Sequence, residues 1–139
     1  MQYLDYEKLD VYQVAMSLVL VVEEVIERLP IGRAYLVDQV RRSSTSVVLN
    51  IAEGAGEHAI AEKNRFYRMA KRSATECAST IEICLRLRLI DETQYTKVRE
   101  RVIRVAGMLT RLIQSKARPP VSLPAVPVNV PVPLPSSGH

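Results

Sequence analysis

The distribution of proline divides this chain into two parts with different structural possibilities. Seven of the eight prolines lie in residues 119–139, and the remaining one is Pro30. Proline lacks a backbone N–H and fixes φ, so a segment this rich in proline cannot continue a helix or a sheet ladder and favours extended or irregular structure. We therefore predict one folded domain over residues 1–118 and a Pro-rich irregular tail over residues 119–139.

Residues 1–118 contain four segments in which apolar residues recur every three or four positions, as on one face of an α-helix. The expected helices are 8–29, 35–54, 61–89, and a fourth from its N-cap Asp91 to about 116. The expected core stripes are Val11, Ala15, Leu18, Val22 and Leu29; Leu36, Val40, Val47 and Ile51; Phe66, Ala70, Ser73, Cys77, Thr80, Ile81 and Cys84; and Tyr95, Val98, Val102, Val105, Leu109, Leu112 and Ile113. Short connections favour antiparallel neighbours, so we predict an all-α fold, an antiparallel up-down-up-down four-helix bundle.

The first predicted helix is apolar around nearly its whole circumference between Val14 and Val22. A small bundle buries one side of a helix, so a helix that is apolar on all sides requires a second covering surface. Met16, Leu20 and Val21 point away from the core stripe, and we predict that they contribute to a homo-oligomer interface.

A polar row follows the flank of the second predicted helix, and it has two interpretations. Its residues either form a solvated face or need partners where helices meet, because a partly buried polar group costs free energy unless it is paired. We favour a structural network that holds helices or subunits in register. Its predicted members are Gln39, Arg41, Arg42, Asn50, Glu53, Arg72 and Glu76.

Charge is unevenly distributed along the sequence. Residues 1–62 hold ten acids and five bases, a net charge of −5, whereas residues 63–118 hold fourteen bases and five acids, a net charge of +9. The basic half either meets the acidic half, which we favour, or attracts nucleic-acid phosphates. Tyr67 and Tyr95 could add stacking, although Tyr95 is better placed for the core. The candidate nucleic-acid-binding residues are Arg65, Arg68, Lys71, Arg72, Lys97, Arg101, Arg104 and Arg111.

The sequence offers little for catalysis or for a cofactor. His58 is in a predicted loop and His139 is terminal, so the Glu-x-x-His pairs of metal-binding bundles are missing and no metal site is expected. Cys77 and Cys84 have no histidine beside them on a predicted helix and fit a core role. Acid–base chemistry by Glu53 or Glu76 is the weaker alternative to the structural network. We therefore expect a protein that is not an enzyme and needs no cofactor.

The first residues carry Asp5, Glu7 and Asp10 and lack the basic region of a secretory signal. The longest apolar run, Val14 to Val22, is too short to span a bilayer. We expect a cytoplasmic protein without a membrane partner.

Four stretches carry a resemblance to a known family: 9–15 (LDVYQVA), 39–44 (QVRRSS), 50–54 (NIAEG) and 73–76 (SATE). In this order they resemble the bacterial four-helix-bundle proteins first described as encoded within intervening sequences of 23S ribosomal RNA genes. The likeness covers about residues 6–115, with Ser43-Ser44 standing where small apolar residues are common. The resemblance implies a ring-shaped homopentamer without known catalysis. More distantly, the family is similar to the basic, pentameric accessory protein of diversity-generating retroelements, which engages nucleic acid.

Two functional hypotheses follow. The first is a non-enzymatic, oligomeric bundle that acts as a nucleic-acid-binding accessory, with RNA or DNA as partner, through the basic rows of residues 63–118. The alternative is a protein-interaction scaffold without nucleic-acid binding, whose Pro-rich tail docks on a neighbour or on a protein partner.

Overall fold

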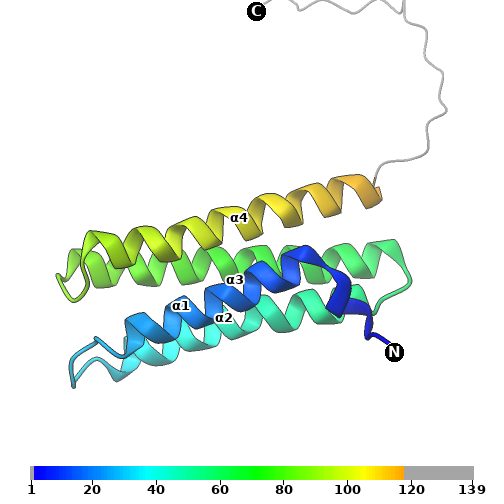
Figure 1. The fold of residues 1–139 in the computed structure, drawn as a ribbon. Coiled ribbons are helices and arrows are strands. Elements are labelled where there is room, and N and C mark those ends of the chain that lie inside the picture. The colour runs from blue at the N-terminus through cyan, green and yellow to red at the C-terminus, as the bar shows by residue number, and fades with distance from the viewer. Residues whose placement is uncertain (1, 118–139) are drawn as a thin grey trace, which may run out of the picture.

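The structure, a computed structural model, describes residues 2–117, and the tail predicted for residues 119–139 lies outside them. Four α-helices follow a short 3-10 helix; their bounds are η1 Asp5–Lys8, α1 Asp10–Ile26, α2 Ala34–Ala55, α3 Ile60–Arg86 and α4 Glu92–Ala117. Each helix packs against the next, and α4 closes against α1 (Figure 1). The helices alternate in direction, so the prediction of an all-α, up-down-up-down four-helix bundle is confirmed. None of the helices in residues 2–117 is both long and apolar enough to cross a membrane.

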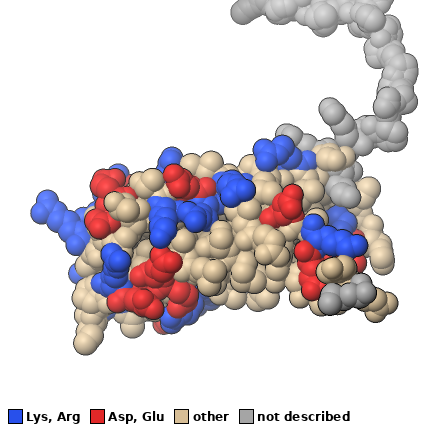
Figure 2. Space-filling model, viewed as in Figure 1, with Lys and Arg blue, Asp and Glu red and all other residues tan. Residues whose placement is uncertain are grey.

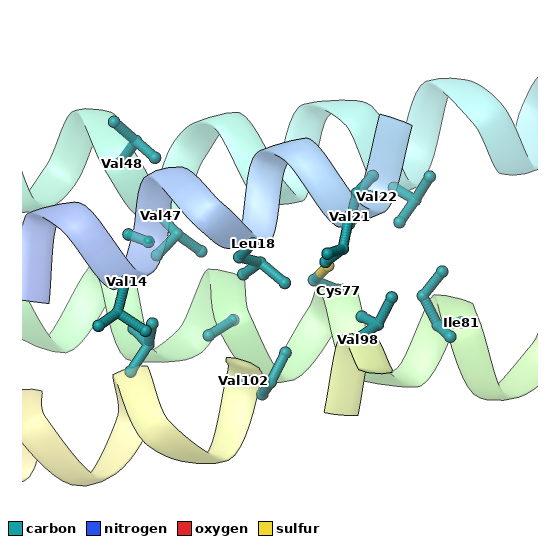
Figure 3. Close-up of a cluster of buried hydrophobic side chains, with 14 of the residues drawn as sticks. Val14, Leu18, Val21, Val22, Val47, Val48, Cys77, Ile81, Val98 and Val102 are labelled. Carbon is teal, nitrogen blue, oxygen red and sulfur yellow. The ribbon is translucent and has the colours of Figure 1, made fainter. Parts of the chain in front are cut away.

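The core lies along the bundle axis and draws side chains from all four helices. Figure 3 shows Leu18 of α1 pointing toward the space between Val47 of α2, Cys77 of α3 and Val102 of α4. The predicted stripe of α2 is completely buried, and that of α1 is buried except for Leu29, which is partly buried against the core. In α4, Val98, Val102, Val105 and Leu109 are buried, and the remaining predicted residues pack around them.

The core face of α3 differs from the prediction at two positions. Phe66 and Ser73 are only partly buried, whereas their neighbours Tyr67 and Ala74 are 2% and 0% exposed. Successive residues differ by about 100° around a helix, so a small error in rotation exchanges neighbours on the core stripe. Ser73 instead faces α2, and the ring of Phe66 lies under the Arg65 guanidinium, 4.6 Å from the ring centroid.

Three helix boundaries differ from the prediction by two residues or more, and the start of α4 was predicted correctly. Extended backbone at Leu9 separates η1 from α1, so α1 begins at Asp10 and not at residue 8. The helix ends at Ile26, three residues before the predicted end at residue 29. The α3 helix ends at Arg86, not 89, because the Leu89 N–H donates to the Cys84 carbonyl and closes a Schellman motif with Arg88 at φ 62°. At α4 the Asp91 carboxylate accepts from the Gln94 N–H at 2.8 Å and the Gln94 side chain accepts from the Asp91 N–H, which confirms Asp91 as the N-cap.

The sequence predicted that the second helix ends at Gly54. In the structure Gly54 lies within α2, which continues to Ala55. A methyl group added at Gly54 would be 2.7 Å from Cε1 of Tyr67, so this glycine is required for the close approach of α3. The end of α2 is stabilised from α3 by Lys63, whose ammonium group donates to the carbonyl oxygens of Gly54 at 2.8 Å and Ala55 at 3.2 Å.

Candidate nucleic-acid interface

Part of the predicted polar network forms a line of contacts between α2 and α3, which we call the α2–α3 seam. The hydroxyl groups of Ser46 and Ser73 are 2.8 Å apart, and the Asn50 amide donates to the Ser46 hydroxyl at 3.0 Å. Toward the other end, the Gln39 amide donates to the Glu76 carboxylate at 3.4 Å and Arg42 donates to the Gln39 oxygen at 3.0 Å. The residues of the seam are Gln39, Arg42, Ser46, Asn50, Ser73 and Glu76.

Three predicted members of the network lie outside the seam. Arg41 turns to α1, where its guanidinium donates to both oxygens of Glu23 at 2.8 and 2.9 Å. This contact lowers the pKa of the Glu23 carboxyl. The exposed side chains of Glu53 and Arg72 make no hydrogen bond or ion pair with other described residues.

Sequence reasoning missed Ser73 as a partner in the seam. The residue was assigned to the core face of α3, although its hydroxyl is the polar group that meets Ser46. A serine among apolar positions is a weak signal, because its hydroxyl can also bond to its own helix, as Ser43 and Ser44 do with the carbonyl oxygens of Val40 and Arg41.

The two thiols are placed for packing. Cys77 and Cys84 are both fully buried, and burial raises the pKa of the Cys77 thiol to about 12. A protonated, buried thiol is a poor nucleophile and a poor metal ligand. Among the described residues, no group of three His, Cys, Asp or Glu side chains is placed to hold a metal ion.

Some of the predicted nucleic-acid-binding residues are already paired with acids. Arg65 donates to Glu62 at 2.6 Å, and Lys97 donates to Glu24 of α1 at 3.0 Å. Arg101 makes only a long contact, 3.5 Å, with the Lys97 carbonyl oxygen. The Lys97–Glu24 pair joins the basic half of the sequence to the acidic half across two helices, whereas the Arg65–Glu62 pair lies within α3.

Six predicted basic residues have no acidic partner among the described side chains. Arg101 is one of them and donates only to the Lys97 carbonyl oxygen. The other five make no hydrogen bond with a described residue either, and we call them the basic surface: Arg68, Lys71, Arg72, Arg104 and Arg111. They lie in the first half of α3 and the second half of α4.

The α3 and α4 helices are antiparallel neighbours (Figure 1). Arg104 and Arg111 follow Lys97, which pairs with Glu24 of α1, at intervals of seven residues, so they lie on the side of α4 that faces α1. Arg111 lies there beside Lys8 and Asp10. Unpaired guanidinium and ammonium groups attract phosphates, so these side chains of α3 and α4 are the candidates for phosphate contacts.

Figure 2 shows the face that α1 and α4 share. Acidic and basic side chains mix at the end where α1 terminates, in keeping with the ion pairs of Glu23 and Glu24. The middle of this face, over α1, is largely uncharged (Figure 2). The mixed charges favour solvation and helix pairing, so this end of the bundle is a poorer phosphate-binding surface than α3 and α4.

Tyr67 cannot take part in stacking with a ligand, contrary to the alternative considered from the sequence. Its side chain is 2% exposed and packs against Gly54. Burial also raises the pKa of its phenol. Tyr95 is partly buried against the core. The sequence signal for Tyr67 was ambiguous because Phe66 and Tyr67 are adjacent aromatic residues on one helix.

The three candidate interface residues of α1 are placed differently from one another. Leu20 is 61% exposed and Met16 is partly buried at the edge of the core. Val21 is only 5% exposed and belongs to the core of the subunit, so it offers a neighbour almost no surface. The correction follows from the rotation of α1, which carries Val21 and Val22 together onto the buried side.

Comparison with known proteins gives a match to a family model and similarity to solved structures. A family model described as "23S rRNA-intervening sequence protein" matches residues 7–111. A crystal structure of a protein with unknown function from the S23 ribosomal protein family of Bacteroides thetaiotaomicron is similar, with 20% sequence identity and a TM-score of 0.70. The alignment covers 75% of this chain and 98% of that one, and at this identity it supports the fold alone. No curated protein matches the sequence.

Proposed function

The chain belongs to the 23S rRNA-intervening sequence protein family, and from this premise we propose that it is a non-enzymatic, oligomeric bundle that binds nucleic acid through its basic surface. The observation that supports the proposal is that five basic side chains of α3 and α4 have no hydrogen-bond or ion-pair partner among the described residues. Phosphate groups are the ligands that such a set neutralises without further chemistry.

The absence of catalysis is part of this proposal. The two carboxylates that were the alternative candidates for acid–base chemistry, Glu53 and Glu76, make no contact with each other. Glu76 accepts a hydrogen bond from Gln39, and Glu53 is exposed without a hydrogen-bond partner among the described residues. His58 is exposed in the connection between α2 and α3. A catalytic group needs a partner within hydrogen-bond reach, and these residues do not supply one to each other.

Oligomerisation is the second part of the proposal. We propose that the protein is a homopentamer and that it is cytoplasmic. No charged residue occurs between Asp10 and Glu23, so the outer face of α1 is free of charge for three turns. Leu20 lies on this face and is largely exposed in the subunit. Covering it with a second copy of the chain would remove apolar surface from water. A ring would also repeat the basic surface and multiply its phosphate contacts.

The test is fluorescence-anisotropy titration of the purified full-length protein with structured RNA and with duplex DNA, at low and at physiological salt. Arg72→Glu combined with Arg104→Glu should weaken binding about tenfold or more, because two attractive charges become repulsive. Arg28→Glu combined with Arg42→Glu is the matched control, since it lowers the net charge from +4 to zero by the same amount. If both pairs weaken binding equally, only net charge matters and the basic surface is not the site.

The alternative is a protein-interaction scaffold that acts through the Pro-rich tail. It is supported by the apolar residues of the tail, Val126, Val128, Val130, Val132 and Leu134, which lie outside the described residues. Deletion of residues 119–139 tests it: loss of assembly or of a protein partner, with nucleic-acid binding absent, would favour the scaffold over the nucleic-acid accessory.

A further inference from the structure

We propose that the Pro-rich tail docks back on its own subunit, with residues 123–128 lying in a groove between the start of α1 and the end of α4. These residues read LPAVPV and lie outside the described part of the chain. Docking on the tail's own subunit differs from the scaffold alternative, in which the tail would reach a neighbour or another protein. It is also independent of the proposed nucleic-acid binding.

The groove lies at the end of the bundle where α1 begins and α4 ends (Figure 1). Its volume is about 440 Å³, within the range of about 300–1,000 Å³ typical of ligand sites. Its apolar lining comes from four side chains, Leu9, Val11, Met108 and Leu112. Tyr3 is 57% exposed, and the centroid of its ring is 5.3 Å from the ammonium nitrogen of Lys8, which also lines the groove. An apolar lining with an exposed aromatic ring close by is typical of grooves that bind Pro-rich segments.

The tail contains one pair of prolines with the P-x-x-P spacing that such grooves recognise. Pro124 and Pro127 are three residues apart, and no other two prolines of the chain have this spacing. A polyproline II helix has three residues per turn, so the pairs Leu123-Pro124 and Val126-Pro127 fall on the same face. They repeat after about 9 Å. The residues of α4 that line the groove span seven positions, about 10 Å along the helix, so the two pairs match its length.

The hydrogen-bonding groups of the groove and the segment are complementary. Residues 123–128 carry six backbone carbonyl oxygens but only four N–H groups, because two of the six residues are proline. A polyproline II segment makes no internal hydrogen bonds, so these oxygens need donors from outside it. Lys8 and Arg111 line the groove and make no hydrogen bond with another described residue, and Ser115 adds a hydroxyl group. Asp10, the acidic residue of the lining, can accept from an N–H group of the segment.

The segment begins close enough to the groove to reach it within the same subunit. Five residues, 118–122, separate Ala117 at the end of α4 from Leu123. At about 3.1 Å per residue they span about 15 Å. Ser115 lines the groove only two residues before the end of α4, so this span is enough to bring Leu123 back beside it. A short linker also gives the segment an effective concentration in the mM range at its own subunit.

Other hollows of the described surface suit the segment less well. The hollow on α3 that runs from Lys71 to Ser79 has no large apolar side chain in its lining. The hollow on α2 has one, Leu49, among polar residues. A third, beside Lys97, holds only about 110 Å³ and lies about 30 Å along α4 from the end of the helix. The groove between the start of α1 and the end of α4 is therefore the one that combines apolar lining, unpaired donors and proximity to the tail.

The experiment records methionine ¹³C-methyl NMR spectra of the full-length protein with a nitroxide spin label on Asn129→Cys, next to the segment. The label attaches there because Cys77 and Cys84 are buried. Met108 lines the groove, whereas Met69 lies on α3 beside Arg65. We expect the Met108 signal to fall about twofold relative to Met69, because an effective concentration in the mM range would keep about half of the tails docked. An equal loss at the two methionines, or none at Met108, would overturn the proposal.

Two triple variants of the tail test which residues dock. Serine at Leu123, Val126 and Val128 should restore the Met108 signal, because the apolar contacts are removed. The matched control places serine at Val130, Val132 and Leu134, which are one Leu and two Val farther along the tail. The control should leave the loss at Met108 unchanged. Equal restoration by both variants would mean that residues 123–128 are not the docked segment.

A mixed sample distinguishes docking within a subunit from docking between copies. In it the spin label and the ¹³C label are on different chains, and we expect no selective loss at Met108. A loss there would place the tail in the groove of a neighbouring copy and would overturn docking on its own subunit. Salt separates this contact from phosphate binding: residues 119–138 hold no Lys, Arg, Asp or Glu, so the loss at Met108 should be the same at low and physiological salt. A loss that disappeared with salt would contradict apolar docking.

Discussion

At the residue scale, the contact between Gly54 and Tyr67 shows how one absent side chain positions two helices. The Tyr67 ring lies where a side chain at position 54 would otherwise be, and the ring is nearly completely buried there. Lys63, one turn earlier on α3, binds the last carbonyl groups of α2. Together these residues fix the start of α3 against the end of α2, which sets where the basic side chains that follow Tyr67 emerge.

We predict that Gly54→Ala destabilises the subunit by about 1–2 kcal/mol. Overpacking costs about 1–3 kcal/mol, while alanine regains up to about 1 kcal/mol of helix propensity. The measurement is the free energy of unfolding in urea. Gly56→Ala is the matched control, because its new methyl group would meet no atom closer than 3.8 Å and its backbone is helical. Equal effects at the two positions would show that the contact with Tyr67 carries no strain.

The sequence predicted the burial of some side chains correctly and of others wrongly, and the difference has a physical reason. The stripe of Leu36, Val40, Val47 and Ile51 was predicted correctly because strong hydrophobes there are flanked by polar residues. On α3 the candidates are small or ambiguous side chains, and burial was assigned to Phe66 when Tyr67 is the buried ring. Whether a basic side chain is paired depends on acids from other helices, as Glu24 of α1 pairs with Lys97 of α4. The periodicity of the sequence contains no information on such neighbours.

At the element scale, the position at which α3 ends differs from the prediction made from its sequence. A Schellman motif needs a left-handed residue, usually glycine, and here that residue is Arg88 at φ 62°. For a residue with a Cβ atom, this conformation costs about 1–2 kcal/mol of conformational free energy. Helix periodicity continued to Leu89 without a glycine to stop it, so the sequence predicted a helix three residues too long. The turn is instead imposed by the need to bring α4 back along α3.

We predict that Arg88→Gly stabilises the subunit by about 0.5–1 kcal/mol. Glycine adopts the left-handed conformation without strain, although part of this gain is lost because glycine is also freer in the unfolded chain. Thermal and urea unfolding measure the difference. Arg86→Gly serves as the comparison: it lies in the last turn of α3, where glycine should destabilise by about 1 kcal/mol. Destabilisation by both changes would mean that the left-handed turn is not strained.

At the scale of the whole molecule, the bundle divides its outer surface by chemistry. The α3 and α4 helices carry unpaired basic residues, the α2–α3 seam carries hydrogen-bonded polar groups, and the middle of α1 is uncharged (Figure 2). The uncharged face was predictable from the run between Asp10 and Glu23, which no single buried side can accommodate. In the proposed oligomer, the uncharged face of α1 would meet a neighbouring copy and the basic side chains would stay exposed to phosphates.

The last prediction tests this partition. Leu20→Arg should leave the subunit folded, because Leu20 is 61% exposed, yet should dissociate the proposed oligomer by placing charge in an apolar contact. Sedimentation velocity measures the assembly, and far-UV circular dichroism checks the helices. Ile31→Arg is the control, since Ile31 is fully exposed in the connection between α1 and α2. If Leu20→Arg retained the wild-type assembly, the outer face of α1 would not be the interface, and the repeated basic surface of a ring would need another geometry.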